Sequence, residues 1–565
     1  MAKIYNLSIK NFRGIKEFNQ QIKTNFVCLI GRGDSGKSTI LEAISCSLTP
    51  SWNYSFFDND FYNCDTSAPI IIEVSLIHLP VEIIREDKFG LYLRGIDAHG
   101  NIVDEIEDAV EPAITIRLEV EKNLEPQWSV ITNREVGSKP ISAGDRGKLN
   151  VFLVADYIDR HFSWSKGGPL YSLLQQESKT PEDDNVMIEA LRGAKSKIDG
   201  AFTKFDSVIN KVKASAAYFG VDISKTSTTI DFKDIVIKDG KVSLHDETIP
   251  FRLKGKGSKR LISMAIQAAI ADAGGIALID EIEQGLEPDR VQNLVNTLKN
   301  HNHGQVFIAT HSRDVLVELN TSDIFLIKKD CKELITFDPS MQGLLRSNPE
   351  AFFAKKVLVA EGASEIGVCR ALNEFRISIG DKNLAYVGVR IANGTGTEMG
   401  TYSKGFVNSG FPTALFCDSD QDDFNTIKPE LKQLGVNIID WDDSDCLESA
   451  IMKYLPFDIV KEVFELAAII QVEKDVTFTL EQYKTNMWTS VKDRFGANCP
   501  NDLSIAADSP ELRKAIGITA NKKGWFKRQD WAYRLGKLIF DNYASLDQTN
   551  YLKIQLRSLS EWIDK

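Results

Sequence analysis

The hydrophobic pattern of this chain alternates between short apolar runs of strand length and segments with helical spacing. The N-terminal stretch MAKIYNLSIKNFRG alternates apolar and polar residues, as a half-exposed strand does. Further along, FVCLI, GIALI and QVFIA are nearly continuous apolar runs, and each is followed at once by glycine or polar residues. Such runs are typical of parallel strands buried on both faces, so the pattern predicts an α/β protein.

A second alternation of strands and helices begins after NPEAFFAKK. KKVLVAEGASE predicts a strand, a turn and a helix start, LAYVGVRIANGTG predicts a second strand, and FPTALFCDSDQDD predicts a third. CLESAIM then opens a helix, and mixed helical sequence follows. Because 565 residues exceed what one hydrophobic core accommodates, we expect three parts, at residues 1–345, 346–455 and 456–565.

A helical insertion is expected within the first part, at residues 155–222. Between residues 181 and 219, apolar side chains recur at helical spacing, and Lys and Asp fill the other face. The apolar positions are Ile188, Leu191, Ile198, Phe202, Phe205, Ile209 and Val212. We expect a helical hairpin that mediates dimerisation, and the alternative is simple packing onto the rest of the first part.

Composition narrows the class of protein. Hydrophobic residues make up 43% and charged residues 26%, as in globular domains, and no apolar run reaches the roughly 18 residues of a membrane span. The N-terminus lacks the apolar core of a signal peptide, and the eight cysteines are scattered, so we expect a cytoplasmic protein with reduced thiols. A net charge of −12 excludes a surface that is basic all over, but it allows a local basic patch for nucleic acid.

A phosphate-binding loop follows the first apolar run, in the pattern G-x-x-x-x-G-K-S. Its small residues let backbone N–H groups surround phosphates, Lys37 reaches the β and γ oxygens, and Ser38 is a ligand for Mg²⁺. The expected cofactors are therefore ATP and Mg²⁺. The candidate nucleotide-binding residues are Gly31, Gly33, Asp34, Ser35, Gly36, Lys37, Ser38 and Thr39.

Two later strands end in residues suited to ATP hydrolysis. GGIALIDEIEQG ends in Asp280, a Mg²⁺ ligand through water, and Glu281, which polarises the attacking water. QVFIATHS ends near His311, which is placed to sense the γ-phosphate. Together with IKNFRGIKEF, these motifs resemble the ATPase heads of the ABC, SMC and RecF type. That resemblance implies that two heads dimerise and that Ser258, in LKGKGSKRLISM, contacts the nucleotide of the partner head. The segment departs from the L-S-G-G-Q signature of transporters, and a basic loop without this role is the alternative.

Acidic residues gather at the predicted strand ends of the second part. Glu361 and Glu365 follow KKVLVA, Asp418 and Asp420 follow FPTALFC, and Glu448 opens a helix. Because parallel strands place their carboxyl ends at one edge of a sheet, we expect these carboxylates to converge. Oxygen ligands without His or Cys favour Mg²⁺ or Mn²⁺, and two such ions can cleave a phosphodiester.

The motif E-G-x-S-E followed by D-x-D resembles the Toprim domain of the OLD (overcoming lysogenization defect) family of nucleases. A RecF-like ATPase at residues 1–345 followed by a Toprim domain is also the domain order of the OLD family. The resemblance extends to the nuclease subunit of the Gabija antiphage system and to OLD nucleases encoded beside retrons. It implies an ABC-type P-loop ATPase head with a helical dimerisation insertion, then a parallel-sheet Toprim nuclease domain and a mostly helical C-terminal part. It also implies antiphage defence, a homo-oligomer, and a co-encoded partner such as a helicase or a retron reverse transcriptase.

Late basic residues complete the predicted site. From Glu511 to Lys537 the net charge is +6, and aromatic residues alternate with the cations in NKKGWFKRQDWAYRLGK. The resemblance implies a lysine beside the metals, for which Lys527 is the first candidate and Lys523 the second. The aromatics predict stacking on exposed bases, and a helix with its aromatics in the core is the alternative.

Two other functions remain open from the sequence. One is a repair ATPase that clamps DNA without cutting it, and the other is a Toprim enzyme that acts on RNA, including tRNA. A topoisomerase-like role is disfavoured because no tyrosine-bearing DNA-binding module is recognisable. The favoured hypothesis is a metal-dependent DNA endonuclease gated by ATP.

Overall fold

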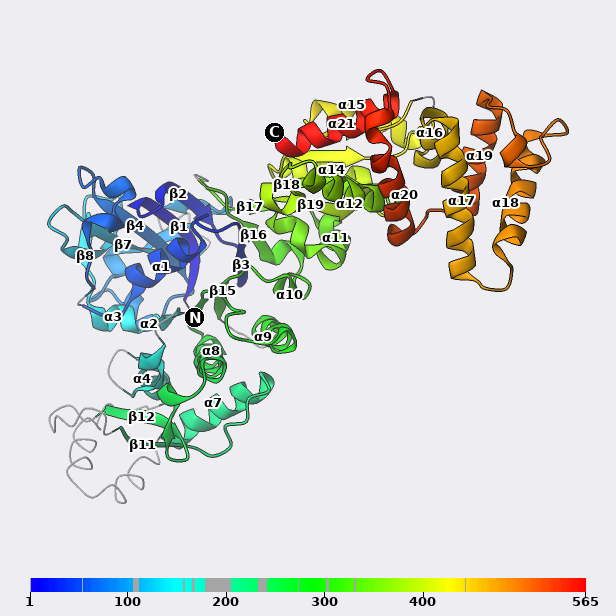
Figure 1. Ribbon diagram of the computed structural model, residues 1–565. Coiled ribbons are helices and arrows are strands. Elements are labelled where there is room, and N and C mark those ends of the chain that lie inside the picture. The colour runs from blue at the N-terminus through cyan, green and yellow to red at the C-terminus, as the bar shows by residue number, and fades with distance from the viewer. Residues whose placement is uncertain are drawn as a thin grey trace. The chain divides into compact units, whose positions relative to one another are not determined.

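The computed structural model describes residues 2–52, 54–104, 111–155, 158–164, 168–177, 205–231, 241–272, 274–300, 304–329, 332–442 and 444–565. Their contacts divide the chain into two units, Met1–Thr336 and Phe337–Lys565 (Figure 1). The predicted segments 346–455 and 456–565 thus belong to one unit. Most of the predicted helical hairpin, including Ile188, Leu191, Ile198 and Phe202, lies outside the described residues.

A six-stranded sheet forms the centre of the first unit, in the order β10-β14-β15-β3-β16-β17. All of its neighbouring strands are parallel except the last pair. The strands are β3 (Phe26–Ile30), β10 (Val151–Val154), β14 (Ile276–Ile279), β15 (Gln305–Ala309), β16 (Ile324–Leu326) and β17 (Ile335–Thr336). Every residue of β3, β14 and β15 is buried, as the apolar runs predict.

A second sheet of this unit is antiparallel, in the order β2-β1-β4-β7-β5-β6, with β8 paired to β7 and β9 paired to β8. Its strands are β1 (Lys3–Phe12), β2 (Ile15–Gln21), β4 (Ile70–Ile77), β5 (Arg94–Ile96), β6 (Ile102–Val103), β7 (Glu111–Val120), β8 (Pro126–Ile131) and β9 (Ser138–Pro140). Helix α1 (Lys37–Leu48) contacts strands of both sheets, so it lies between them. A smaller sheet contains β11 (Thr226–Asp231), β12 (Lys241–Asp246) and β13 (Ile249–Pro250).

Helices pack on the parallel sheet beside β10 and β14. Helix α8 (Lys256–Asp272) contacts both strands, and α4 (Pro169–Glu177) and α7 (Asp206–Tyr218) pack on α8, whereas α9 (Pro288–Asn300) contacts α7. The described part of the predicted hairpin is α7, whose apolar face buries Val208, Ile209 and Val212. In this part of the chain the apolar stripe therefore contributes to packing within the unit.

One buried histidine predicts acid sensitivity of the first unit. His161 lies within 2.5 Å of Ser263 Oγ through Nδ1, and burial lowers the pKa of His161 to about 4. Because the unfolded chain takes up this proton near pH 6.5 and the folded chain does not, stability is lost between pH 6.5 and 4, by up to about 3 kcal/mol. We expect urea midpoints of a His161→Asn variant to depend less on pH over this range. Equal slopes for both proteins would contradict the assignment.

The second unit is built on a four-stranded parallel sheet in the order β19-β18-β20-β21. Its strands are β18 (Lys356–Ala360), β19 (Val389–Asn393), β20 (Thr413–Phe416) and β21 (Asn437–Ile439). Ala360 pairs with Phe416, so Glu361 and the residues after β20 leave the sheet at the same edge. LAYV forms the short helix α13 (Leu384–Val387) instead of continuing the predicted strand, because the Asn383 side chain caps it and Gly388 ends it at φ 80°.

Helices surround this sheet and extend beyond it. They are α11 (Gln342–Ser347), α12 (Ala363–Ser378), α14 (Met399–Asn408), α15 (Asp422–Gln433), α16 (Leu447–Tyr454), α17 (Phe457–Lys474), α18 (Leu480–Phe495), α19 (Pro510–Lys523), α20 (Gln529–Asp541) and α21 (Tyr551–Asp564). One apolar cluster joins α12, α16, α19, α20 and α21 to the strands. The C-terminal helices therefore complete the core around this sheet.

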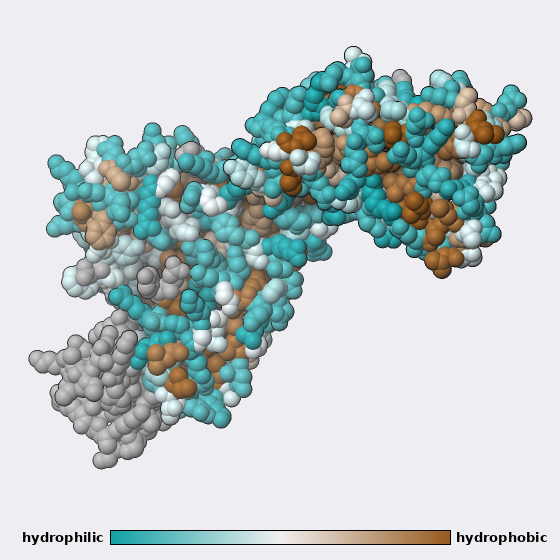
Figure 2. Space-filling view, viewed as in Figure 1, coloured by the Kyte–Doolittle hydropathy of each residue, from teal (hydrophilic) through white to brown (hydrophobic). Residues whose placement is uncertain are grey.

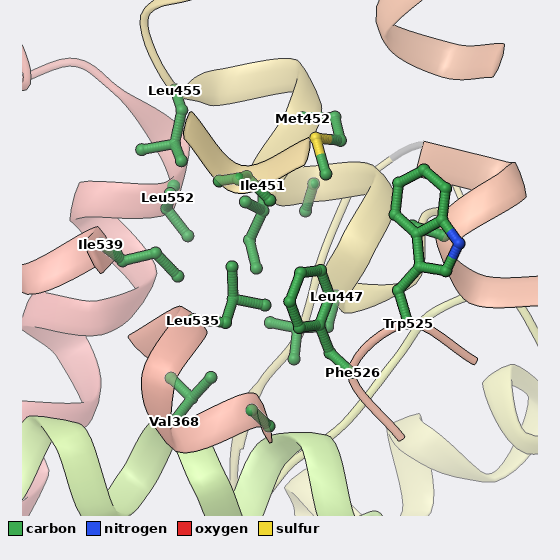
Figure 3. Close-up of a cluster of buried hydrophobic side chains, with 14 of the residues drawn as sticks. Val368, Leu447, Ile451, Met452, Leu455, Trp525, Phe526, Leu535, Ile539 and Leu552 are labelled. Atoms are coloured by element: carbon green, nitrogen blue, oxygen red, sulfur yellow. The ribbon is translucent and has the colours of Figure 1, made fainter. Parts of the chain in front are cut away.

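The aromatic residues of the late basic segment are part of this core. Trp525 is 2% exposed, Phe526 is 0% exposed and Trp531 is 8% exposed. Figure 3 shows Trp525 and Phe526 among the side chains of the cluster, beside those of α16 and α20. The predicted stacking of these aromatics on bases is wrong, because their rings fill the space between helices.

Apolar side chains reach the surface on the hairpin of α17 and α18, where Figure 2 shows a brown patch. Val476 and Phe478, in the connection between the two helices, are 86% and 42% exposed. Across the described residues, no helix is both long and apolar enough to cross a membrane.

Candidate functional site

The phosphate-binding loop connects β3 to α1 in the first unit. Gly31, Asp34 and Gly36 have φ angles of 155°, 59° and 104°. Positive φ angles allow the tight turn that this loop makes between β3 and α1. Lys37 Nζ donates to the carbonyls of Gly31 and Arg32, both at 3.0 Å. Burial lowers the pKa of Lys37, and nearby carboxylates, Asp280 first, oppose this shift.

The loop fits a nucleotide phosphate. Ser35 Oγ is buried and has no hydrogen-bond partner among the described residues, so it is an unused donor inside the loop. A side chain at Gly31 would meet Ile327 O at 2.4 Å, which explains why the loop begins with glycine. Ser38 and Thr39 lie in the first turn of α1, and Ser38 is exposed.

The acidic pair lies at the end of β14, next to β15 and one strand away from β3. Glu281 is exposed and has a φ of 43°, an unusual backbone for a non-glycine residue and one that is frequent at functional sites. Asp280 Oδ1 accepts from the Glu281 N–H at 3.0 Å. Glu283 accepts from Thr310 Oγ1 and from the His311 N–H, both at 2.7 Å, and so holds the end of β15.

The segment of Ser258 contacts this acidic loop within the chain. A Cβ at Gly257 would lie 2.6 Å from Gly285 O, so the start of α8 packs directly on the loop after Glu283. Arg260 donates to the carbonyls of Asp280 and Glu281, a contact that sequence analysis missed because Arg260 belongs to no recognised motif. Ser258 is partly exposed at the first turn of α8.

The candidate metal site lies at the carboxyl edge of the sheet in the second unit. Glu361 Oε2 accepts from the Asp418 N–H at 2.8 Å, which joins the ends of β18 and β20. Glu365, in the first turn of α12, accepts from the Gly362 N–H at 2.9 Å and is 3% exposed. Asp418 Oδ1 accepts from the Leu447 N–H at 2.8 Å and is 6% exposed, whereas Asp420 is exposed.

Glu448 is the most enclosed carboxylate of this group. It is 0% exposed, and neither of its oxygens has a hydrogen-bond partner among the described residues. Lys527 Nζ lies 3.6 Å from Glu448 Oε1, and the Lys527 side chain is 43% exposed. A buried carboxylate without hydrogen bonds is costly, so the site is chemically incomplete as the protein alone.

The pKa values of the cluster also indicate that its negative charges are not fully compensated. Burial raises the pKa of Glu365 to about 7, with Glu361 adding to the rise, and burial likewise raises the pKa of Asp418 well above its ordinary value. Burial opposes the charge of Lys527, but Glu448, Asp418 and Glu365 outweigh it and raise the pKa of Lys527. The acidic groups thus repel one another, and one lysine offsets only part of their charge.

The donor set fits hard divalent cations, because it consists of carboxylate oxygens. In the described residues, however, no three acidic, His or Cys side chains already meet at metal-binding separation. Glu361, Glu365 and Asp418 are instead turned toward backbone N–H groups. Cation binding therefore requires these side chains to exchange hydrogen bonds for the ion.

Neutralising a buried carboxylate is expected to stabilise the metal-free protein. For Glu365→Gln at pH 8 without divalent ions, we expect the melting temperature of the second unit to rise by a few degrees, because repulsion from Glu361 is removed. Mn²⁺ is expected to stabilise the wild type more than the variant. Asp420→Asn is the control, since an exposed carboxylate pays little for its charge. Identical melting temperatures for all three proteins without metal would contradict the repulsion.

A buried lysine that the sequence did not single out holds the D-x-D loop. Lys428 of α15 is 8% exposed, and its Nζ donates to Ser419 Oγ at 3.0 Å and to Asp440 Oδ2 at 2.8 Å. Asn425 Nδ2 donates to Ser419 O at 2.8 Å. The only sequence signal for this role of Lys428 is its position in a helical segment ten residues after Asp418.

The two lysine candidates differ in their placement. Lys527 follows the buried Trp525 and Phe526, and Ser364 Oγ donates to Phe526 O at 3.2 Å, which ties this segment to the start of α12. Lys523 lies in the exposed last turn of α19. The structure thus brings Lys527 to the acidic cluster.

Three family models match this chain. Residues 2–157 match a model described as an AAA ATPase domain, and residues 159–318 match an AAA domain described as a putative AbiEii toxin of a type IV toxin–antitoxin system. Residues 352–420 match the Toprim domain of proteins like the overcoming lysogenization defect protein. No curated protein matches the chain.

Solved structures give weaker likenesses. An Smc head domain with an extended coiled coil, bound to the C-terminal domain of ScpA, from Pyrococcus furiosus is 14% identical, covers 60% of this chain and 97% of its own, and has a TM-score of 0.36. An SMC head domain from Thermotoga maritima is 11% identical, covers 60% and 99%, and has a TM-score of 0.29. The recombination mediator protein RecF with ATP is 14% identical, covers 59% and 98%, and has a TM-score of 0.35.

The assignment of the chain rests on the family models and on the motifs in their places. The ATPase models span the phosphate-binding loop and the acidic pair, and the Toprim model spans Glu361, Glu365, Asp418 and Asp420. ATPase domains and a following Toprim domain are the combination of ATP-driven nucleases of the OLD kind. The chain therefore combines ATPase domains with an OLD-like Toprim domain, the combination that matches an OLD family ATPase–Toprim nuclease.

Proposed function

We propose that this protein is an ATP-regulated endonuclease that hydrolyses DNA phosphodiester bonds with Mg²⁺ or Mn²⁺ at the carboxyl edge of the second sheet. The observation that supports this most directly is Glu448, a fully buried carboxylate that has no hydrogen-bond partner among the described residues and lies next to Lys527. Such an arrangement is costly unless cations bind there.

In this proposal the acidic residues supply the oxygen ligands, and bound cations activate water and offset charge on the leaving oxygen. The candidate ligands are Glu361, Glu365, Asp418, Asp420 and Glu448. Lys527 remains charged beside them, and its ammonium is available to a phosphate oxygen as charge develops during cleavage. Glu361 is held by the N–H of Asp418, so the two central strands position it.

The first unit would bind ATP at its phosphate loop. Backbone N–H groups, Ser35 and Lys37 contact phosphates, Ser38 and Asp280 hold Mg²⁺, and Glu281 orients the attacking water near His311. Pairing of two heads would bring Ser258 of one chain to the nucleotide of the other. We infer that the nucleotide state controls cleavage, because both activities reside in one chain.

The biological setting is also part of the proposal. An antiphage role in the cytoplasm is consistent with the family, as is a co-encoded partner such as a helicase or a retron reverse transcriptase. RNA is a second possible substrate, because hydrolysis with two cations does not require the sugar to be deoxyribose.

The test is cleavage of supercoiled plasmid by purified protein with Mg²⁺ or Mn²⁺, with and without ATP, and with an RNA arm. We expect nicked or linear DNA that disappears with EDTA and with a Glu361→Gln/Asp418→Asn variant. A Lys37→Ala variant, compared with and without ATP, shows whether ATP activates or restrains cleavage. Normal cleavage by the Glu361→Gln/Asp418→Asn variant would overturn the proposed site.

A further inference from the structure

A cavity of about 990 Å³ adjoins the candidate metal site in the second unit. It lies between α16 and α19, and its wall includes Asp420 and two neighbours of Glu448, Cys446 and Ser449. The other charged residues of the wall are Asp445, Lys453, Asp508, Arg513, Lys514 and Lys522.

Within the described part of the chain, two lysines of the cavity wall have no acidic partner. Arg513 pairs with Asp508, its Nε lying 2.6 Å from Asp508 Oδ1, and also donates to backbone carbonyls of α16. Lys453 pairs with Asp445 at 3.4 Å. Lys514 and Lys522 are exposed, and no described carboxylate lies within 4.0 Å of either ammonium group.

The two lysines lie on one face of α19. They are eight residues apart, which corresponds to about 12 Å along a helix, and Ile518 lies between them. A pair of ammonium groups at this separation can contact two different phosphates of one strand more readily than a single anion. Asn521 adds a polar group to the same wall.

Close helix packing holds this lysine face beside the metal site. A Cβ at Gly517 would lie 2.7 Å from Ser449 Cα, so α19 contacts α16 at the residue next to Glu448. Since the interior of a packed unit resists sliding, the lysines keep their place relative to Asp420 and Glu448.

We propose that this cavity holds the DNA backbone on one side of the bond that is cut, with Lys514 and Lys522 binding phosphates of that strand. This inference rests on the proposed nuclease function and extends it, because the substrate must continue for several nucleotides past the scissile phosphate on this side. Mononucleotides and very short fragments are accordingly poor ligands.

The experiment is DNA binding by a Lys514→Glu/Lys522→Glu variant of the full chain, measured by fluorescence anisotropy with a labelled 30-nucleotide strand in Ca²⁺. We expect at least a tenfold weaker affinity near 100 mM salt and a salt slope smaller by about 1.4, as for two lost phosphate contacts. The matched control is Lys355→Glu/Lys382→Glu, which makes the same charge change at the opposite edge of the sheet, beside the start of β18 and the end of α12. The control is expected to bind like the wild type.

The outcomes separate this inference from the nuclease proposal. An equal loss of affinity in the control would overturn the inference, since only net charge would matter, and so would an unchanged salt slope in the Lys514→Glu/Lys522→Glu variant. Weaker binding of a matched RNA alone would assign the cavity to RNA and overturn the DNA assignment. The Mn²⁺-induced rise in melting temperature checks that the variant retains its metal site. Plasmid cleavage tests the nuclease proposal independently of this binding assay.

Discussion

Replacing Lys527 by methionine is expected to reduce metal-dependent DNA cleavage by roughly a hundred- to a thousand-fold. Lys527 is the cation that the structure places beside the acidic cluster, 3.6 Å from Glu448. Its loss removes a positive charge from the place where negative charge grows on the phosphate during cleavage. The measurement is the single-turnover cleavage rate with saturating Mn²⁺.

The same substitution also tests the ion pair. Lys527→Met leaves Glu448 fully buried without a nearby ammonium group, so we expect the metal-free protein to lose about 1 to 2 kcal/mol of stability. A Glu448→Gln/Lys527→Met double variant is expected to regain that stability without regaining cleavage. This separation distinguishes a role in the reaction from a purely structural one.

Lys523→Met is the matched control, because it removes the same charge four residues earlier, in the exposed last turn of α19. We expect it to cleave at close to the wild-type rate. Strong loss of cleavage in Lys523→Met together with normal cleavage by Lys527→Met would reverse the assignment of the two lysines.

Replacing Gly367 by valine is expected to destabilise the second unit by about 3 kcal/mol and to abolish cleavage. Even a Cβ at Gly367 would lie 2.5 Å from Ala532 Cβ and 2.7 Å from the backbone atoms Gln529 O and Tyr533 N. Gly536 of α20 makes the reciprocal contact, where a Cβ would lie 2.6 Å from Ala371 Cβ. A larger side chain must therefore force α12 and α20 apart.

Separation of these helices reaches the site directly. Glu365 precedes Gly367 on α12, and Lys527 precedes α20, so the helix contact determines how the carboxylate and the lysine face each other. The measurements are thermal unfolding and plasmid cleavage. The control is Arg370→Val, which places the same β-branched residue at an exposed position of α12. A Gly367→Val variant with wild-type stability and activity would show that the contact is not needed.

Local sequence determined the parts of this protein that depend on short-range geometry. The phosphate loop from Gly31 to Ser38 combines an apolar strand, glycines for a left-handed backbone and a helix start, and each is readable from neighbouring residues. The shared sheet edge of Glu361 and Asp418 was predictable for a similar reason. Glu361 directly follows β18, Asp418 is the second residue after β20, and parallel strands end at one edge.

In the basic C-terminal segment, prediction from neighbouring residues fails. Trp525 and Phe526 alternate with lysines as they do on a base-stacking surface, but the structure buries both rings among helices. Spacing along the chain does not say which face of a segment meets the core, since that depends on neighbours far away in sequence. The prediction was therefore wrong about the burial of the aromatic rings. It was not wrong about the exposure of the basic residues, because Lys514 and Lys522 of the same region are exposed.

The sequence by itself determined the two domain types, the nucleotide loop and the strand-end carboxylates, because these features are set by runs of a few residues. Only the tertiary structure decided that Glu448 is fully buried next to Lys527, that Lys428 holds the D-x-D loop, and that α19 presents its lysines beside Asp420. The physical reason is that burial, ion pairing and close helix packing arise between segments distant in sequence. The glycines that permit this packing, such as Gly367 and Gly517, show their role only when both helices are in place.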